Sequence, residues 1–219
     1  MKITELFDLA HTQARVYLSG FEYPWEALPG IHGMIIELSS ALDEDYTEIA
    51  PQVWVHKTAN VAPSAHLSGP CIIGKNTEVR HCAFVRGNAL VGDNCVIGNS
   101  TELKNVILFD NVQVPHFNYV GDSILGYKAH MGAGSVTSNV KSDKSLVCVK
   151  TGGETIDTGL KKFGAMLADF VEIGCNSVLN PGSVVGRNST VYTVTSVRGV
   201  VPQDCIFKGP GNIVRKEQR

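Results

Sequence analysis

The chain has 219 residues, of which 43% are hydrophobic and 18% are charged. This composition is too apolar and too weakly charged for a disordered chain, and the length fits one domain with a small appendage. The formal net charge of -2 comes without a long basic run, which disfavours nucleic acid as a partner.

Membrane and metal-binding classes are disfavoured as well. The sequence has no run of about 18 apolar residues, and its first residues, Met1 to Glu5, lack the apolar core of a signal peptide. The six cysteines show no paired, metal-type spacing. We therefore expect a cytoplasmic protein without a membrane partner, whose cysteines are small buried thiols.

Residues 1–50 are predicted to form a small helical cap. Positions at helical spacing open the chain: Leu6, Leu9, Ala10, Gln13 and Val16. Pro24 interrupts this pattern, and a second helix is predicted between Ile31 and Leu42. A cap is expected because the repetitive segment that follows needs its end covered.

From Val55 onward an aliphatic residue recurs at every sixth position. The series continues without a miss through Val61, Leu67, Ile73, Val79, Val85, Val91, Ile97 and Leu103. A period of six predicts one short strand and one turn per repeat, with the aliphatic side chain pointing inward. Three repeats then form a triangular coil of about 18 residues, and successive coils stack as parallel strands.

The series slips by one residue after Leu103 and again after Val120, and it stops altogether between 140 and 166. The interruption is rich in lysine and glycine, and we expect an inserted loop there, since long ordered loops are often functional. The predicted organisation is a cap over 1–50, a β-helix over 51–209 with a loop at about 140–166, and a tail over 210–219.

Arg86 and Lys104 are 18 positions apart, and each follows an inward aliphatic residue. Their side chains should therefore stack on adjacent coils, roughly 5 Å apart. Two like charges this close repel each other unless something negative lies between them. Either a phosphate-sized ligand binds both, or each pairs with a nearby acid such as Glu102, and the sequence leaves both alternatives open.

His116 comes two residues after the inward Val114, which places it at an outward corner. An imidazole held in a cleft is a suitable proton acceptor, although a lone surface histidine is usually inert. Counting coils places Ala133 over His116, and its glycine neighbours would leave room there for backbone N–H groups to approach an oxyanion. Two ordinary turns would also explain this pattern. Counting does not place His116 at the corner of Arg86.

In order and spacing these residues resemble the acetyltransferase domain of the bifunctional bacterial sugar nucleotidyltransferases that make UDP-N-acetylglucosamine. The matching positions are Arg86, Glu102, Lys104, His116, Tyr119 to Asp122, Gly132 to Gly134 and Asn139. The stretch from Thr158 to Gly164 is still more similar to the archaeal sugar-1-phosphate nucleotidyltransferases that carry an amino-sugar acetyltransferase domain. The resemblance covers roughly residues 55–205. It implies an all-β fold, a left-handed parallel β-helix of hexapeptide repeats with a small α-helical N-terminal cap.

The resemblance also implies a hexapeptide-repeat transferase, a CoA-dependent N-acetyltransferase that uses acetyl-CoA as co-substrate and needs no metal. The acceptor would be the amine of a hexosamine phosphate such as glucosamine-1-phosphate, and the enzyme would be a homotrimer. The implied roles are as follows: His116 is the general base, Asn139 lies beside the amine, Arg86, Lys104 and Tyr119 hold the sugar phosphate, and Gly132, Ala133 and Gly134 lie beside acetyl-CoA.

The sequence departs from this family in two respects. Nothing in residues 1–50 could supply the nucleotidyltransferase half, so a separate nucleotidyltransferase is an expected partner. His130 stands where the bacterial enzymes have a sugar-contacting asparagine. These departures also fit a catalytically idle sugar-phosphate-binding or assembly protein. The matching loop lysine is Lys144 or Lys150. A carbonic anhydrase on the same kind of helix is disfavoured, since the seven histidines lack its closely spaced ligand pair.

Overall fold

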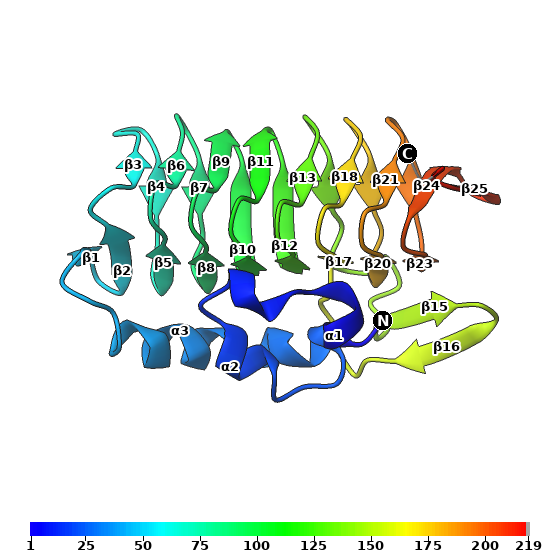
Figure 1. Cartoon of the computed structure of the whole chain (residues 1–219), viewed down its shortest axis with the longest axis horizontal. Coiled ribbons are helices and arrows are strands. Elements are labelled where there is room, and N and C mark those ends of the chain that lie inside the picture. Colours follow the sequence, from blue (N-terminus) through cyan, green and yellow to red (C-terminus); the bar gives the residue numbers. More distant parts are fainter. Residues whose placement is uncertain (218–219) are drawn as a thin grey trace.

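The computed structural model describes residues 1–217, which form a three-sided column of short, mostly parallel strands (Figure 1). The predicted fold class, a left-handed parallel β-helix of hexapeptide repeats, is confirmed. None of the helices in the described part of the chain is long and apolar enough to cross a membrane.

Three faces make up the column. The first face consists of β3 (Asn60–Val61), β6 (Glu78–Val79), β9 (Val96–Asn99), β11 (Gln113–His116), β13 (His130–Met131), β18 (Glu172–Ile173), β21 (Thr190–Val191) and β24 (Cys205–Gly209). The second face consists of β4 (His66–Leu67), β7 (Phe84–Val85), the start of β10 (Glu102–Leu108), the start of β12 (Tyr119–Leu125), β14 (Val136–Thr137), β19 (Val178–Leu179) and β22 (Ser196–Val197). The third face consists of β2 (Val53–His56), β5 (Cys71–Ile73), β8 (Ala89–Val91), the ends of β10 and β12, β17 (Ala165–Leu167), β20 (Ser183–Val185) and β23 (Val200–Val201).

The aliphatic series forms the core of the column. Val85, Leu103 and Val120 pair in register on three successive coils, and each is fully buried. The coils approach closely at Gly98, where an added Cβ would lie 1.5 Å from the carbonyl oxygen of Pro115. Only glycine allows the coils to stack at this point.

Both one-residue slips lie at the corner between the second and third faces. There β10 and β12 run on from one face to the other, and Asn105 and Asp122 turn the chain with φ of 55° and 47°. Asparagine and aspartate tolerate this left-handed conformation better than most residues. Each slip shortens this corner by one residue. The shortened corner therefore fixes the position of the Cβ atom of Asp122.

Residues 1–42 lie along the third face of the column and not over its end (Figure 1). The segment contains α1 (Ile3–Leu6), η1 (Leu9–His11), α2 (Arg15–Leu18), η2 (Pro24–Gly30) and α3 (Ile31–Ser39). The physical reason is that strands of the third face carry aliphatic residues outward as well as inward. The outward ones include Ile72, Leu90, Ile107 and Ile124, all at most 1% exposed beneath this cover.

Antiparallel strands pair with the edge strands at both ends of the column. β1 (Tyr46–Ala50) pairs with β2, and β25 (Asn212–Arg215) pairs with β24. Sheet edges left open would invite pairing with other chains, so β1 and β25 each protect one sheet edge at their end of the column. The predicted tail over 210–219 thus contributes a strand, and its last two residues lie outside the described part.

The insertion at 140–166 is partly regular. It contains the antiparallel hairpin β15 (Cys148–Thr151) and β16 (Glu154–Asp157), which extends away from the column (Figure 1). Phe163 then packs beside Trp25, with 5.8 Å between the ring centroids. Because Phe163 is fully buried, the insertion returns to the column through a fixed contact with the N-terminal segment.

Candidate active site

Residues that follow the inward position of the second face form a column that we call the basic corner: Arg86, Lys104, Gly121, Ser138, Asn180 and Arg198. Strand register places Lys104 next to Gly121 on one side and next to Arg86 on the other. The predicted stacking of Arg86 and Lys104 on adjacent coils is therefore confirmed.

Two cations of the basic corner, Arg86 and Lys104, are each paired with an acid. Arg86 Nη1 lies 2.7 Å from Glu102 Oε1, and Lys104 Nζ lies 2.9 Å from Asp122 Oδ1. Of the two alternatives left open by the sequence, the structure has the acid pairs. The local charge is balanced, but each cation still has unused N–H donors.

Asp122 joins three of the predicted site residues. Its carboxylate, 5% exposed, accepts bonds from Lys104 Nζ and from Asn139 Nδ2 at 2.5 Å. Asn139 Nδ2 also donates to the hydroxyl of Tyr119 at 3.2 Å. Sequence reasoning assigned no role to Asp122, although it ends the matching segment; its position at the shortened corner was the available signal.

Tyr119 keeps its hydroxyl proton. Burial raises the pKa of Tyr119, and the charges of Asp122 and Glu102 raise it further. Since Asn139 donates to this hydroxyl, the O–H of Tyr119 is left to donate to a ligand.

His116 is the last residue of β11, exposed at the edge between the first and second faces. Its carbonyl accepts the N–H of Gly134 at 3.0 Å, and Gln113 pairs with His130. This register places Ala133 beside His116 on the next coil, as counting predicted. Within the described residues the imidazole makes no hydrogen bond, so both ring nitrogens are available to a ligand.

Asn118 fixes the turn that follows His116. Its side chain is buried, and its Nδ2 donates to the carbonyls of Gly132 at 2.9 Å and Ser135 at 3.1 Å. The His116 coil and the coil of Ala133 are thereby tied together. His116 and the basic corner nevertheless lie at opposite edges of the second face, so a ligand that touches both would cross that face.

The N–H groups of Gly132 to Gly134 differ in what they bind. Gly132 donates to Ile173 O at 2.7 Å, and Gly134 donates to His116 O at 3.0 Å. The N–H of Ala133 has no acceptor among residues 1–217. Of the backbone N–H groups of these three residues, only that of Ala133 is therefore free to donate to an oxyanion.

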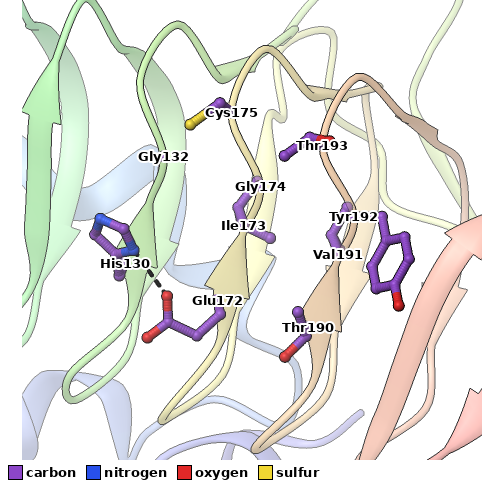
Figure 2. A pocket seen from close by; sticks show the side chains of 10 residues that line it. All are labelled: His130, Gly132, Glu172, Ile173, Gly174, Cys175, Thr190, Val191, Tyr192 and Thr193. Atoms are coloured by element: carbon purple, nitrogen blue, oxygen red, sulfur yellow. Dashed lines mark hydrogen bonds and ion pairs between the residues drawn. The ribbon is translucent and has the colours of Figure 1, made fainter.

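A groove of about 470 Å³ crosses the first face next to this segment (Figure 2). Its lining is mostly apolar and comprises His130, Gly132, Glu172, Ile173, Gly174, Cys175, Thr190, Val191, Tyr192 and Thr193. An added Cβ on Gly132 would lie 2.7 Å from the nitrogen of Cys175, so a side chain there would force the coils apart. Glycine is therefore needed here for the two coils to stack beside the groove.

His130 lies on the first face, away from the basic corner. It begins β13, opposite Gln113, and its Nδ1 lies 2.7 Å from Glu172 Oε2 (Figure 2). The structure thus places this residue, predicted to contact the sugar, at the wall of the groove.

A separate cavity lies beside the basic corner. Neither Lys144 nor Lys150 lines this cavity, and the loop lysine that lines it is Lys141.

No group of three or more histidine, cysteine, aspartate or glutamate side chains in the described part of the chain could hold a metal ion. The cysteines are divided between the core and the surface: Cys71, Cys95 and Cys205 are buried, Cys148 is half-buried, and Cys82 and Cys175 are exposed. Burial raises the pKa of the Cys71 and Cys95 thiols to about 12, which keeps both unreactive. The expectation of buried thiols therefore holds for three of the six.

Comparison with known proteins gives consistent matches. A family model described as the GMPPB C-terminal domain matches residues 67–160. The "Bifunctional protein GlmU" of Methanococcus maripaludis is 29% identical over 222 residues, which cover 99% of this chain and 54% of that protein. The "Bifunctional sugar-1-phosphate nucleotidylyltransferase/acetyltransferase" of Sulfurisphaera tokodaii is 28% identical over 220 residues, covering 95% and 55%.

The chain thus spans about half the length of the curated relatives that it matches. Among solved structures, the acetyltransferase domain of PglB from Neisseria gonorrhoeae in complex with acetyl coenzyme A covers 78% of this chain and 58% of its own, with 17% identity and a TM-score of 0.37. Over nearly its whole length the chain resembles the hexapeptide-repeat acetyltransferase half of the bifunctional sugar-1-phosphate nucleotidyltransferase/acetyltransferase family.

Proposed function

We propose that the chain is a CoA-dependent N-acetyltransferase that moves an acetyl group from acetyl-CoA to the amine of a hexosamine phosphate such as glucosamine-1-phosphate. One observation carries the proposal: the second face has the exposed His116 at one edge and the linked Lys104, Tyr119 and Asn139 at the other. In glucosamine-1-phosphate the amine is on the carbon next to the phosphorylated one. A sugar phosphate held by Lys104 and Tyr119 would therefore direct its amine across this face, past Asn139 and toward His116.

In this mechanism His116 accepts a proton from the substrate amine. The amine nitrogen then attacks the thioester carbonyl, the new C–N bond replaces the C–S bond, and CoA leaves as the thiol after proton transfer. A general base of this kind contributes typically about 10² to 10⁴-fold. The free N–H of Ala133 is the donor available to the developing oxyanion.

The remaining residues bind the two substrates. Arg86 and Lys104 keep their acid partners and offer their unused N–H groups to the phosphate, with the hydroxyl of Tyr119 as a further donor. Asn139 lies beside the amine. Acetyl-CoA occupies the first-face groove, where Gly132 and the apolar lining suit its pantetheine arm. His130 lies in the wall of the same groove.

A direct assay tests this function. Purified protein is incubated with acetyl-CoA and glucosamine-1-phosphate, and we expect thiol release together with an N-acetylated product detected by mass spectrometry. Glucosamine without phosphate should react poorly, because it lacks the group that the basic corner holds. Absence of product with glucosamine-1-phosphate, galactosamine-1-phosphate and related amines would reject the transferase assignment.

A second candidate is a catalytically idle protein that binds sugar phosphates or assembles with a separate nucleotidyltransferase. It is favoured by the imidazole of His116, which no carboxylate or carbonyl of the described residues orients. This candidate predicts binding of glucosamine-1-phosphate in calorimetry without release of CoA from acetyl-CoA.

We infer further that the chain is a homotrimer. Phe117 and Val194 lie on one corner of the column, 62% and 77% exposed, and both adopt left-handed φ of 51° and 57°. Two bulky apolar side chains exposed at one corner are readily explained if a neighbouring column covers them. A prism with flat sides also packs easily with cyclic symmetry.

Light scattering should therefore give a mass three times the 23.6 kDa of one chain. Replacing Phe117 or Val194 by glutamate should dissociate the assembly, because a charge would be buried in the contact. Val16, which is 85% exposed on α2, is the control, and its replacement by glutamate should leave the mass unchanged. A monomer at all concentrations would contradict the inference.

A further inference from the structure

The basic corner continues beyond the candidate active site, to the point where the inserted loop passes over the column. Ser138 N–H donates to Leu179 O at 2.8 Å, and Asn180 N–H donates to Val197 O at 3.0 Å. These bonds stack Ser138, Asn180 and Arg198 on successive coils. Since neighbouring strands are about 4.8 Å apart, Arg198 lies roughly 19 Å along the column from Lys104.

A cavity of about 270 Å³ lies between the loop and this part of the corner. Its lining comprises Ser138, Val140, Lys141, Ser142, Asp143, Asn180, Pro181 and Arg198. One side therefore belongs to the rigid column, and the other belongs to the first residues of the insertion. The insertion creates this cavity, because the column alone presents only a convex edge there.

The cations of this cavity are less fully neutralised than those beside the active site. Arg198 is exposed and makes no ion pair in the described part of the chain, in contrast to Arg86 and Lys104. Lys141 Nζ lies 3.9 Å from Asp143 Oδ2, and Asp143 is the one acid in the lining. Two cations and one carboxylate leave a net positive charge.

The carboxylate of Asp143 already accepts hydrogen bonds from its own loop. Its Oδ1 accepts from the backbone N–H of Ser145 at 2.9 Å and from the hydroxyl of Ser145 at 2.8 Å. These bonds, with the charge of Lys141, hold the pKa of Asp143 below its usual range. The carboxylate stays ionised and tied to the loop, so it does not compete for Arg198.

The donors that remain free match an anion of phosphate type. The side chains of Ser138 and Ser142 make no hydrogen bond within residues 1–217, and Arg198 offers a guanidinium fork. Lys141 Nζ donates to Ser145 Oγ at 2.5 Å and Leu146 O at 3.3 Å, which holds it at the rim. A planar guanidinium, an ammonium and two hydroxyls are a donor set well suited to phosphoryl oxygens.

We propose that this cavity, which we call the Arg198 site, binds a phosphoryl group. It goes beyond the proposed acetyl transfer, which uses Arg86, Lys104 and His116 and needs no contact with Arg198. The phosphoryl group comes from one of two sources, either the phosphates of CoA or the phosphate of the acceptor, which in the second case lies here and not beside Arg86 and Lys104. The chemistry recognised is the same in both cases, and binding experiments separate them.

Calorimetric titrations of the wild-type chain and of Arg198→Gln test the proposal, with CoA, 3′-dephospho-CoA and glucosamine-1-phosphate as ligands. We expect Arg198→Gln to bind one of the phosphorylated ligands about tenfold more weakly, since a charge-assisted bond is lost. Weaker binding of CoA but not of 3′-dephospho-CoA identifies the 3′-phosphate. Equal weakening of both identifies the pyrophosphate, and weaker binding of glucosamine-1-phosphate identifies the acceptor.

Arg80 provides the matched control. It also follows an inward valine, but it is paired with Glu78 at 2.8 Å, so Arg80→Gln should leave all three affinities unchanged. Lys141→Gln should weaken the same ligand as Arg198→Gln does. If both variants bind all three ligands as the wild type does, the proposal is overturned. Because binding is measured without turnover, a chain inactive in acetyl transfer still gives a decisive result.

Discussion

Replacing His116 by alanine is expected to lower the rate of acetyl transfer to glucosamine-1-phosphate by roughly 10² to 10⁴-fold, the usual contribution of a general base. Free amines are mostly protonated near neutral pH and do not attack a thioester until the proton is removed. The measurement is the rate of thiol release at saturating acetyl-CoA. Adding imidazole to the variant should restore part of the activity.

The same variant should keep its melting temperature within a few degrees. The side chain is exposed, and it makes no hydrogen bond among the described residues, so its removal costs little packing. What holds the turn in place is the backbone N–H of His116, which donates to Asn118 Oδ1 at 3.1 Å and is unaffected by the substitution. A large fall in stability would mean that the loss of rate has a structural cause.

His81 is a close control for this experiment. Asn99 pairs with His116, and the Nδ2 of Asn99 donates to His81 O at 3.0 Å, so His81 occupies the same corner position two coils earlier. His81→Ala should retain the activity of the wild type. Unchanged turnover in His116→Ala, or an equal loss in both variants, would remove His116 from the mechanism.

The sequence predicts the backbone of this site well because the repeat fixes register. Once the chain winds with six residues per strand and turn, counting alone places Lys104 beside Arg86 and Ala133 beside His116, and both pairings are present. In a parallel β-helix each strand is paired with a neighbour at a fixed distance in sequence. The place of a residue within the repeat therefore predicts which residues lie beside it on the neighbouring coils.

Side-chain partners are not fixed by the period in the same way. The sequence left open whether Arg86 and Lys104 share a ligand or pair with acids, because both arrangements suit the same backbone. Asp122 decides the matter for Lys104, since the shortened corner directs its buried carboxylate at the ammonium. A slip of one residue in the repeat marks such a corner, but its consequence for the charges needs coordinates.

The position of the N-terminal segment shows a different limit. Helical spacing predicted helices in residues 1–50, and helices are present, but they lie along the third face. The available signal was the run of consecutive aliphatic residues in strands such as Ile72 and Ile73, where a half-exposed strand would alternate. The hairpin from Cys148 to Asp157 lies where the six-residue repeat stops, so the repeat could not predict its antiparallel pairing.

The second large effect is expected at Asp122, which we infer to be a positioning residue. Asp122→Ala removes the carboxylate that accepts hydrogen bonds from Lys104 Nζ, Asn105 Nδ2 and Asn139 Nδ2. An ammonium that is only 24% exposed then has no counter-charge, so we expect the free energy of unfolding to fall by about 2–3 kcal/mol. Because Asn139 and Lys104 are no longer held, kcat/KM for the acceptor should fall by about 100-fold.

Two controls separate positioning from stability. Asp169 is another buried carboxylate, paired with Arg187 at 3.1 Å, and Asp169→Ala should cost stability without altering kcat/KM of the folded protein. Adding Lys104→Met to Asp122→Ala removes the unpaired ammonium, so chemical denaturation should show that stability recovers by at least about 1 kcal/mol. Catalytic efficiency should stay low in the double variant, because the ammonium of Lys104 is absent and Asn139 is still not held by Asp122. If activity recovered together with stability, Asp122 would have only a structural role.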